Sequence, residues 1–207
     1  MSKSLQLYNL ELENPKLAKE WHPNKNGKLT PRDFVKSSRQ KVWWKCSKGH
    51  EWQAMIVGRD KGNNCPYCGG QLPSKENNFK KSNPKLSKEW HPRNKLTPSE
   101  VTPCSQIKVW WICSKGHEWE SSINTRSRGY GCPYCSGHKA SKDNCLETIA
   151  PKLAKEWHPT KNGGITPRDV TKGSMKKVWW KCSKGHEWQA TVNNRYHGTG
   201  CKMCRWK

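Results

Sequence analysis

The chain has 207 residues, of which 32% are hydrophobic, and its 39 Lys and Arg against 16 Asp and Glu give a formal net charge of +23. The small apolar fraction excludes one large hydrophobic core and favours several small units that a bound metal stabilises. No apolar run approaches the roughly 18 residues that span a membrane. The charge predicts a polyanionic partner, most often nucleic acid, and no basic amphipathic helix indicates a membrane surface instead.

Each third of the chain opens with a segment bounded by prolines. The first is Pro15–Pro23, and Pro84–Pro92 and Pro151–Pro159 match it. Proline at the front, with Leu17 and Trp21 four residues apart, predicts one or two helical turns that carry both side chains on one face. A turn-rich connector follows, and it is two residues shorter in the middle third, which is typical of a surface loop.

A β-hairpin is expected next in each third, from Val-Trp-Trp through the segment after Gly-His. The Gly between its strands suits a tight turn with positive φ. In the first copy, alternation puts Val42, Trp44 and Cys46 on the inner face and Trp43 and Lys45 on the outer face.

The most specific feature is Cys-x3-His followed by Cys-x2-Cys, which occurs three times with the Cys pair beginning fifteen residues after the His. Three thiolates and one imidazole suit tetrahedral zinc in a closed, structural site. Disulfides would need an oxidising compartment, and no secretory signal is visible, so we expect three zinc ions, one per repeat, in a reducing, cytoplasmic setting. The predicted ligands are Cys46, His50, Cys65, Cys68; Cys113, His117, Cys132, Cys135; and Cys182, His186, Cys201, Cys204.

These features predict a small metal-stabilised α+β fold of three tandem zinc-ribbon-like units, each a short helix plus a β-hairpin and one zinc site. We place the units at residues 1–70, 71–140 and 141–207, with boundaries in the polar joints after the Cys pairs. A treble clef would seat its last two ligands at the start of a helix. Only three residues follow Cys204, and Gly-Gly-Gln-Leu-Pro follows Cys68, so we favour the ribbon.

The order Pro-x-Leu-Ala-x-Glu-Trp, Leu-Thr-Pro, Val-Trp-Trp-x-Cys-x-x-Gly-His-x-Trp, Arg and Gly-Cys-Pro-x-Cys resembles the probable zinc-ribbon repeat of bacterial, phage and some plant proteins. That family of treble-clef or zinc-ribbon repeats is often tandem and sometimes lies beside an endonuclease-like domain. The resemblance runs from about Asn9 to Cys204, and it implies zinc binding and DNA recognition. The third copy departs from it at Lys202-Met203, where the family has Pro and often Tyr. No nuclease domain is visible, so nothing catalytic carries over.

Basic and aromatic residues recur at equivalent positions and would form three related patches. Phosphate contact is the functional interpretation of the basic residues, and ordinary exposed charge is the alternative. The outward Trp of each hairpin could stack on a base, although packing under its own helix is favoured. The predicted nucleic-acid-binding residues are Lys41, Lys48, Arg59, Lys108, Lys115, Arg126, Lys177, Lys184, Arg195, Trp43, Trp110 and Trp179.

Glu20, His22 and Asn26 recur as a set in the other two copies and could indicate a metal-dependent nuclease. The zinc sites are already full, the Asn spacing changes in the middle copy and no second acid cluster accompanies the set, so we favour structural capping. No catalytic residue is predicted, and Cys104 and Cys145, which lack counterparts in the other copies, are expected to be bystanders.

The sequence therefore predicts a monomeric, zinc-dependent protein that binds nucleic acid, with duplex DNA favoured over RNA. Three linked modules would gain affinity through effective concentration even if each binds weakly. One alternative is an adaptor that binds an acidic protein partner. A small metal-dependent nuclease is a further and less favoured one.

Overall fold

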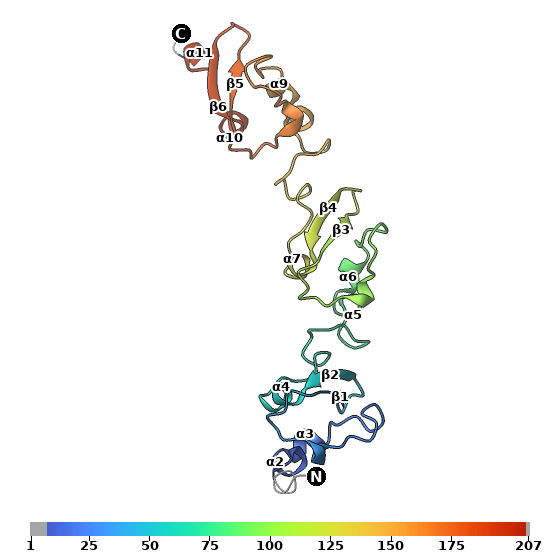
Figure 1. Cartoon of the computed structure of the whole chain (residues 1–207). Coiled ribbons are helices and arrows are strands. Elements are labelled where there is room, and N and C mark those ends of the chain that lie inside the picture. The colour runs from blue at the N-terminus through green and yellow to red at the C-terminus, as the bar shows by residue number, and fades with distance from the viewer. Residues whose placement is uncertain (1–7, 206–207) are drawn as a thin grey trace. The chain divides into compact units, whose positions relative to one another are not determined.

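The computed structural model describes residues 8–205 (Figure 1). The chain divides into two compact units. One unit runs to Lys88 and includes Lys95–Gln106, and the other contains Glu89–Asn94 and the chain from Ile107 onward. The first unit thus holds the first repeat together with α5, α6 and η2 of the second. The other holds the hairpin and α7 of the second repeat together with the third repeat. Among the described residues, no helix is long and apolar enough to cross a bilayer.

The same order of short elements recurs along the chain. The first repeat contains α2 (Leu10–Glu13), α3 (Pro15–Ala18), the 3-10 turn η1 (Pro31–Asp33), β1 (Lys41–Lys45), β2 (Glu51–Met55) and α4 (Ile56–Asp60). The second contains α5 (Phe79–Ser82), α6 (Pro84–Ser87), η2 (Pro98–Glu100), β3 (Lys108–Ile112), β4 (Glu118–Ser122) and α7 (Ile123–Ser127). The third contains α8 (Leu146–Ile149), α9 (Pro151–Ala154), η3 (Pro167–Asp169), β5 (Lys177–Lys181), β6 (Glu187–Thr191), α10 (Val192–Tyr196) and α11 (Lys202–Arg205).

Local caps set where the first helices begin. The side chain of Asn9 accepts a hydrogen bond from the backbone N–H of Leu12 (3.1 Å), and Asn14 does the same for Leu17 (3.1 Å). Pro15 occupies the first turn of α3, where its missing N–H costs nothing. Each helix has only four residues, so tertiary packing rather than helix propensity must stabilise it.

The helix predicted over Pro15–Pro23 is shorter than expected. It ends at Ala18, and Trp21 instead forms a β-bridge with Trp44. Backbone bonds from Lys45 N–H to Glu20 O (2.7 Å) and from His22 N–H to Trp43 O (3.1 Å) hold this segment along β1. Leu17 therefore lies in the predicted helix, but Trp21 does not. At Trp21, hydrogen bonds to β1 replace the helical ones. Trp90 and Trp157 form the matching bridges with Trp111 and Trp180.

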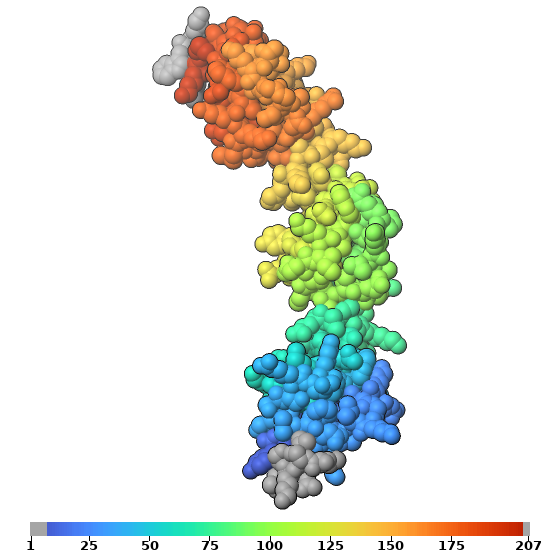
Figure 2. Space-filling view, viewed as in Figure 1, coloured from blue at the N-terminus to red at the C-terminus, as the bar shows by residue number. Residues whose placement is uncertain are grey.

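Each hairpin is an antiparallel pair whose inner Trp is fully buried. In the first, Trp44 lies opposite Trp52, and the ring of Trp21 packs edge-on against Trp44 with centroids 5.5 Å apart. The first core contains Leu10, Leu17, Val42, Trp44, Trp52, Ile56 and Cys65, and the third contains Leu146, Val170, Val178, Trp180 and Val192. The predicted inner face of Val42 and Trp44 is confirmed. Side chains fill the spaces between the ribbons in each repeat (Figure 2).

The turn between the strands has the predicted glycine geometry. Gly49 has a φ of 83°, and Gly116 and Gly185 have 77° and 83°. The N–H of Gly49 donates to Cys46 O (2.9 Å), and the N–H of Cys46 donates to His50 O (3.1 Å). A residue with a Cβ would be strained in this left-handed region, so glycine is needed to bring the Cys and the His together.

Candidate metal centre

The four predicted ligands of each repeat converge on one point. Within each set, one ligand atom from every residue lies within 4.8 Å of all the others. In the first set, His50 Nδ1 lies 3.4 Å from Cys46 Sγ, 3.7 Å from Cys65 Sγ and 3.4 Å from Cys68 Sγ. Cys46 Sγ and Cys68 Sγ are 3.9 Å apart. Two ligands come from the turn between β1 and β2, and two come from the loop after α4.

These distances match a tetrahedral zinc site. With Zn–S of about 2.3 Å and Zn–N of about 2.05 Å, a tetrahedron has S–S edges of about 3.8 Å and S–N edges of about 3.6 Å. The second set has S–N distances of 3.4–3.7 Å and one S–S distance of 3.8 Å. In the third set the corresponding distances are 3.3–3.6 Å and 3.8 Å. The residues present therefore fit zinc in all three repeats.

The electrostatics of the thiols also favour a cation at this point. Desolvation raises the pKa of Cys46, but hydrogen bonds from the backbone N–H groups of His50 and Lys48 oppose it, and the net pKa falls to about 7. Desolvation, together with the nearby Cys65 and Cys46 sulfurs, raises the pKa of Cys68 to about 11. Without a metal, three thiolates this close would not all ionise at neutral pH, and a dication removes that repulsion.

A family model described as a probable treble clef zinc finger domain matches residues 17–71, 86–138 and 153–207, well over half of the chain. The chain belongs to this family. As a treble clef protein with three complete Cys3His sets, it binds three zinc ions, one per repeat. No curated protein matches the chain.

The treble clef description differs from the ribbon variant that the sequence favoured. Both share the turn that carries the first two ligands, and they differ in the structure at and after the last Cys pair. In the third repeat the last ligand, Cys204, lies inside α11, so the short remainder of the chain does not prevent a helical turn. In the first repeat Gly69 N–H donates to Cys65 O (2.9 Å), which closes one turn at the Cys pair without a longer helix.

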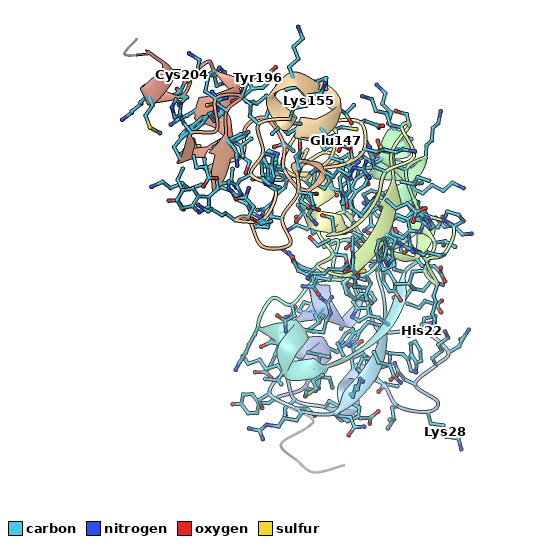
Figure 3. The ribbon with its side chains drawn as sticks, turned by 90° about the horizontal axis from the view of Figure 1, so that it is seen from above. His22, Lys28, Glu147, Lys155, Tyr196 and Cys204 are labelled. Atoms are coloured by element: carbon cyan, nitrogen blue, oxygen red, sulfur yellow. The ribbon has the colours of Figure 1, made fainter. Side chains whose placement is uncertain are left out.

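The six predicted lysines all lie on the surface. Lys41, Lys108 and Lys177 begin the first strand of each hairpin, and Lys48, Lys115 and Lys184 occupy the turn beside the metal ligands. All six side chains are exposed, and none forms an ion pair with a described residue. Lys28, in the connector, likewise projects away from the ribbon (Figure 3).

The three predicted arginines are interior residues, which corrects the expectation of phosphate contact. Arg59 is only 6% exposed, and its terminal nitrogens donate to Glu20 and to the backbone carbonyl of Asn63. Its guanidinium carbon lies 5.4 Å and 5.1 Å from the ring centroids of Trp44 and Trp52. Arg126 and Arg195 are buried in the same way, against Glu89 and Glu156. A phosphate would have to displace these contacts, so the three arginines are not free to bind one.

The outward tryptophans are half-buried, and each carries a cation on one ring face. Lys25 Nζ lies 4.4 Å from the centroid of Trp43, and Arg93 and Lys161 occupy the matching places over Trp110 and Trp179. The expected packing of Trp43 under its own helix is wrong, because Leu17 and Trp21 lie on the Trp44 side of the hairpin.

The Glu, His and Asn residues that could have indicated a nuclease each contact a different part of the repeat. Glu20 pairs with Arg59. His22 Nδ1 accepts from the backbone N–H of Lys25 (3.1 Å), and its Nε2 lies 3.1 Å from Glu51. Asn26 bonds both the N–H (2.8 Å) and the carbonyl (2.9 Å) of Trp43. Their geometry supports the capping interpretation.

Asn94 in the middle repeat makes the same two bonds to Trp110 (2.9 and 2.8 Å), although it is one residue closer to its His. The shorter connector of the middle repeat therefore preserves the contact between this Asn and the strand.

Sequence reasoning missed two acidic residues beside the metal ligands. His50 Nε2 lies 3.2 Å from Glu76, and His117 Nε2 lies 3.1 Å from Asp143. Hydrogen bonds from Ser74 and His50 lower the pKa of Glu76 to about 2. The signal was present, because Ser-Lys-Glu-Asn and Ser-Lys-Asp-Asn both follow a Cys pair at the same distance.

Proposed function

We propose that this zinc protein binds nucleic acid, with duplex DNA favoured over RNA, through lysines repeated on its three units. The observation that carries the proposal is the set of six exposed lysines at equivalent positions, without an acidic partner in the described part of the chain. A recurring surface charge of this kind, on a chain of net charge +23, suits a repeating polyanion.

In the first hairpin the neighbouring acid, Glu51, does not cancel this charge, because it already has partners. Glu51 bonds Lys25 (2.6 Å) and lies 3.3 Å from Lys45. Bonds from Lys25 and His22 lower the pKa of Glu51 to about 2, so it stays ionised and engaged at neutral pH. Lys41 and Lys48 are left as the uncompensated cations of the hairpin.

The hairpin separates its two lysines along the strand direction. Lys41 starts β1 and Lys48 lies beyond its far end, so the strand between them spans roughly 17 Å at about 3.3 Å per residue. That length corresponds to about five phosphate steps along one strand of DNA. Contacts of this type fix orientation and register without reading sequence.

The tryptophans favour a phosphate-led mode. A base that stacked on the covered face of Trp43 would have to displace Lys25, and phosphate contact needs no such displacement. A base could also stack on the uncovered face of Trp43. This mode would still be nucleic-acid binding, but it would favour single strands.

The test is a titration of the zinc-loaded protein with duplex DNA, single-stranded DNA and RNA at several salt concentrations. Two triple variants, K41Q/K108Q/K177Q and K48Q/K115Q/K184Q, should each weaken duplex binding and reduce the slope of log K against log salt by up to about 2.7. The control K16Q/K85Q/K152Q removes the same charge from exposed lysines of α3, α6 and α9 and should change the slope less.

If all three variants reduced the salt slope equally, the hairpin lysines would have no special role, and the binding would be a non-specific attraction to the net charge. Weak binding to every nucleic acid, lost at moderate salt, would reject it in favour of an acidic protein partner. Strong Trp quenching on single strands alone would replace the duplex with a single-stranded target.

A further inference from the structure

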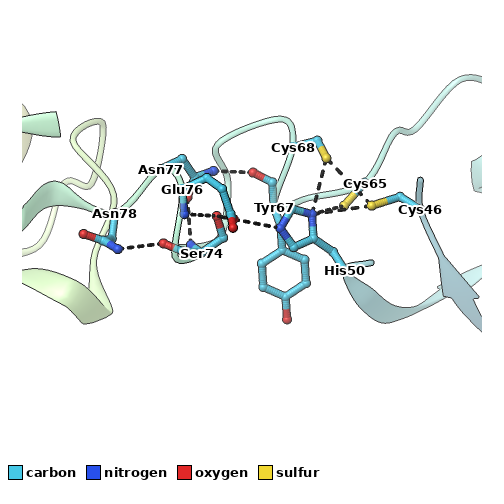
Figure 4. Close-up of polar contacts among 9 residues, drawn as sticks. All are labelled: Cys46, His50, Cys65, Tyr67, Cys68, Ser74, Glu76, Asn77 and Asn78. Atoms are coloured by element: carbon cyan, nitrogen blue, oxygen red, sulfur yellow. Dashed lines mark hydrogen bonds and ion pairs between the residues drawn. The ribbon is translucent and has the colours of Figure 1, made fainter. Parts of the chain in front are cut away.

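The zinc-ligating histidine of the first repeat is held on both sides by residues outside the ligand set. Its Nδ1 faces the sulfurs, and its Nε2 lies 3.2 Å from Oε2 of Glu76 (Figure 4). The ring of Tyr67, which lies between the two Cys ligands, stacks on the imidazole with centroids 5.1 Å apart. Glu76 follows His50 by 26 residues and lies beyond the predicted end of the first repeat at residue 70.

The segment that carries Glu76 is itself folded onto this centre. The N–H of Ser74 donates to Asn77 Oδ1 (2.7 Å), and Ser74 Oγ donates to Glu76 (2.7 Å). The side-chain amide of Asn77 donates to the backbone carbonyl of Tyr67. Residues 74–77 are therefore attached to the metal loop at two points, through the histidine and through the Cys-Pro-Tyr-Cys backbone.

The same arrangement recurs after the second repeat. Asp143 Oδ2 lies 3.1 Å from His117 Nε2, and Tyr134 packs on that imidazole with centroids 5.2 Å apart. Ser141 N–H donates to Asn144 Oδ1 (2.7 Å), and the amide of Asn144 donates to Tyr134 O (2.5 Å). We call residues 74–77 and 141–144 the linker clasps.

Each clasp continues directly into the next helix. The amide of Asn78 donates to Ser74 O (2.7 Å), and its Oδ1 accepts from Lys81 N–H (3.0 Å) as the N-cap of α5. A continuous series of hydrogen bonds thus runs from the zinc-ligating histidine through Glu76 and Ser74 to the first helix of the following repeat (Figure 4).

The clasp residues are not found at the start of the first repeat or, among the described residues, at the third centre. The positions that match Glu76 and Asn77 at the start of the first repeat hold Leu7 and Tyr8, neither of which offers a carboxylate or an amide side chain. At the third centre an exposed Met203 replaces the Tyr, and no described acidic residue lies against His186.

We propose that Glu76 and Asp143 are positioning residues for the zinc-ligating histidines of the preceding repeats, and that zinc loading of one repeat thereby orders the first residues of the next. A carboxylate at Nε2 keeps the proton on that nitrogen and leaves the Nδ1 lone pair for the metal. Without zinc the histidine is not fixed, so the clasp loses its anchor.

The experiment measures zinc release from the full zinc-loaded chain to a metallochromic chelator, with trypsin cleavage after Lys75 and Lys142 mapped by mass spectrometry. In the unmodified chain, two ions should leave slowly and one quickly, and both lysines should resist cleavage. E76A should leave one slow ion, with release of the affected ion 10–100-fold faster, and it should expose Lys75 alone. D143A should do the same for Lys142.

The matched controls are E76D, which copies the acid of the second clasp and should restore slow release, and E120A, which removes an exposed charge from β4. Near-UV circular dichroism with three bound zinc ions per chain establishes that each variant is folded. Release and cleavage in E76A that equal those of the unmodified chain would overturn the proposal. So would an equal loss in E120A, or three ions leaving the unmodified chain at one rate.

Discussion

Arg59 and Glu20, 39 residues apart in the chain, form an ion pair beneath the first hairpin. The pair joins α4, which follows the hairpin, to the segment that runs along β1. Arg126–Glu89 and Arg195–Glu156 repeat it. Each of these arginines lies in the interior of a very small core. Its guanidinium contacts the acid, a backbone carbonyl and two indole rings.

Arg59→Met should therefore destabilise the first repeat by about 3 kcal/mol, because it leaves Glu20 and the carbonyl of Asn63 without their partner. Glu20 is partly exposed, which puts the loss at the low end for broken buried pairs. Thermal unfolding of the zinc-loaded protein by circular dichroism would measure it. Arg39→Met, at an exposed position, is the control. Equal melting curves for the two variants would show that the pair contributes nothing.

Removal of zinc should unfold the protein almost completely. The repeats have cores of only a few side chains and helices of four or five residues, so metal binding supplies much of their folding free energy. Chelation should abolish the near-UV signal of the tryptophans and expose their rings, and zinc should restore both. A metal-free protein that kept its native near-UV spectrum would contradict this expectation.

Cys145→Asn should stabilise the third repeat by about 1 kcal/mol. Cys145 is the N-cap of α8 and makes no side-chain cap bond, whereas Asn9 and Asn78 cap α2 and α5 from equally buried positions. The melting temperature of the zinc-loaded variant tests the idea. Cys104→Asn, at an exposed position without a capping role, should leave it unchanged. A lower melting temperature for the Cys145 variant would show that the site does not accept the amide.

Acid unfolding should follow zinc release rather than the carboxylates. The backbone N–H of Thr30 lowers the pKa of Asp33, so the stabilisation from this contact is present above the ordinary Asp range of about 3.9 and is lost as pH falls through the lowered pKa. Zinc must leave earlier, because protons compete for thiols such as Cys46, whose metal-free pKa is about 7.

Asp33→Ala should consequently lower the melting temperature at neutral pH and leave the acid midpoint unchanged. Trp fluorescence and a zinc-sensitive dye, recorded together from pH 8 to pH 3, would test this order. A fluorescence change that precedes zinc release, or an acid midpoint that moves with the variant, would reverse the conclusion.

The sequence predicted the metal centres and the hairpins because both depend on local patterns. Cys and His spacing determines which side chains can meet, and alternation around Trp44 determines which face is buried. The roles of Arg59 and Trp21 could not be obtained in this way. A basic residue in a polar loop looks like a surface charge until the groups that enclose it are known, and its acidic partner, Glu20, lies 39 residues away in the chain. Similarly, spacing alone could not show that bonds to β1 would end the helix before Trp21.

The contact between His50 and Glu76 means that the minimal complete module is offset from the repeat seen in the sequence. A fragment cut after residue 70 would keep all four ligands of the first centre but lose the carboxylate that orients one of them. A fragment extended through Asn77 would keep it. Each repeat added to such an array would bring one further clasp. In a longer array, a larger fraction of the zinc centres would therefore have a carboxylate at the ligating histidine.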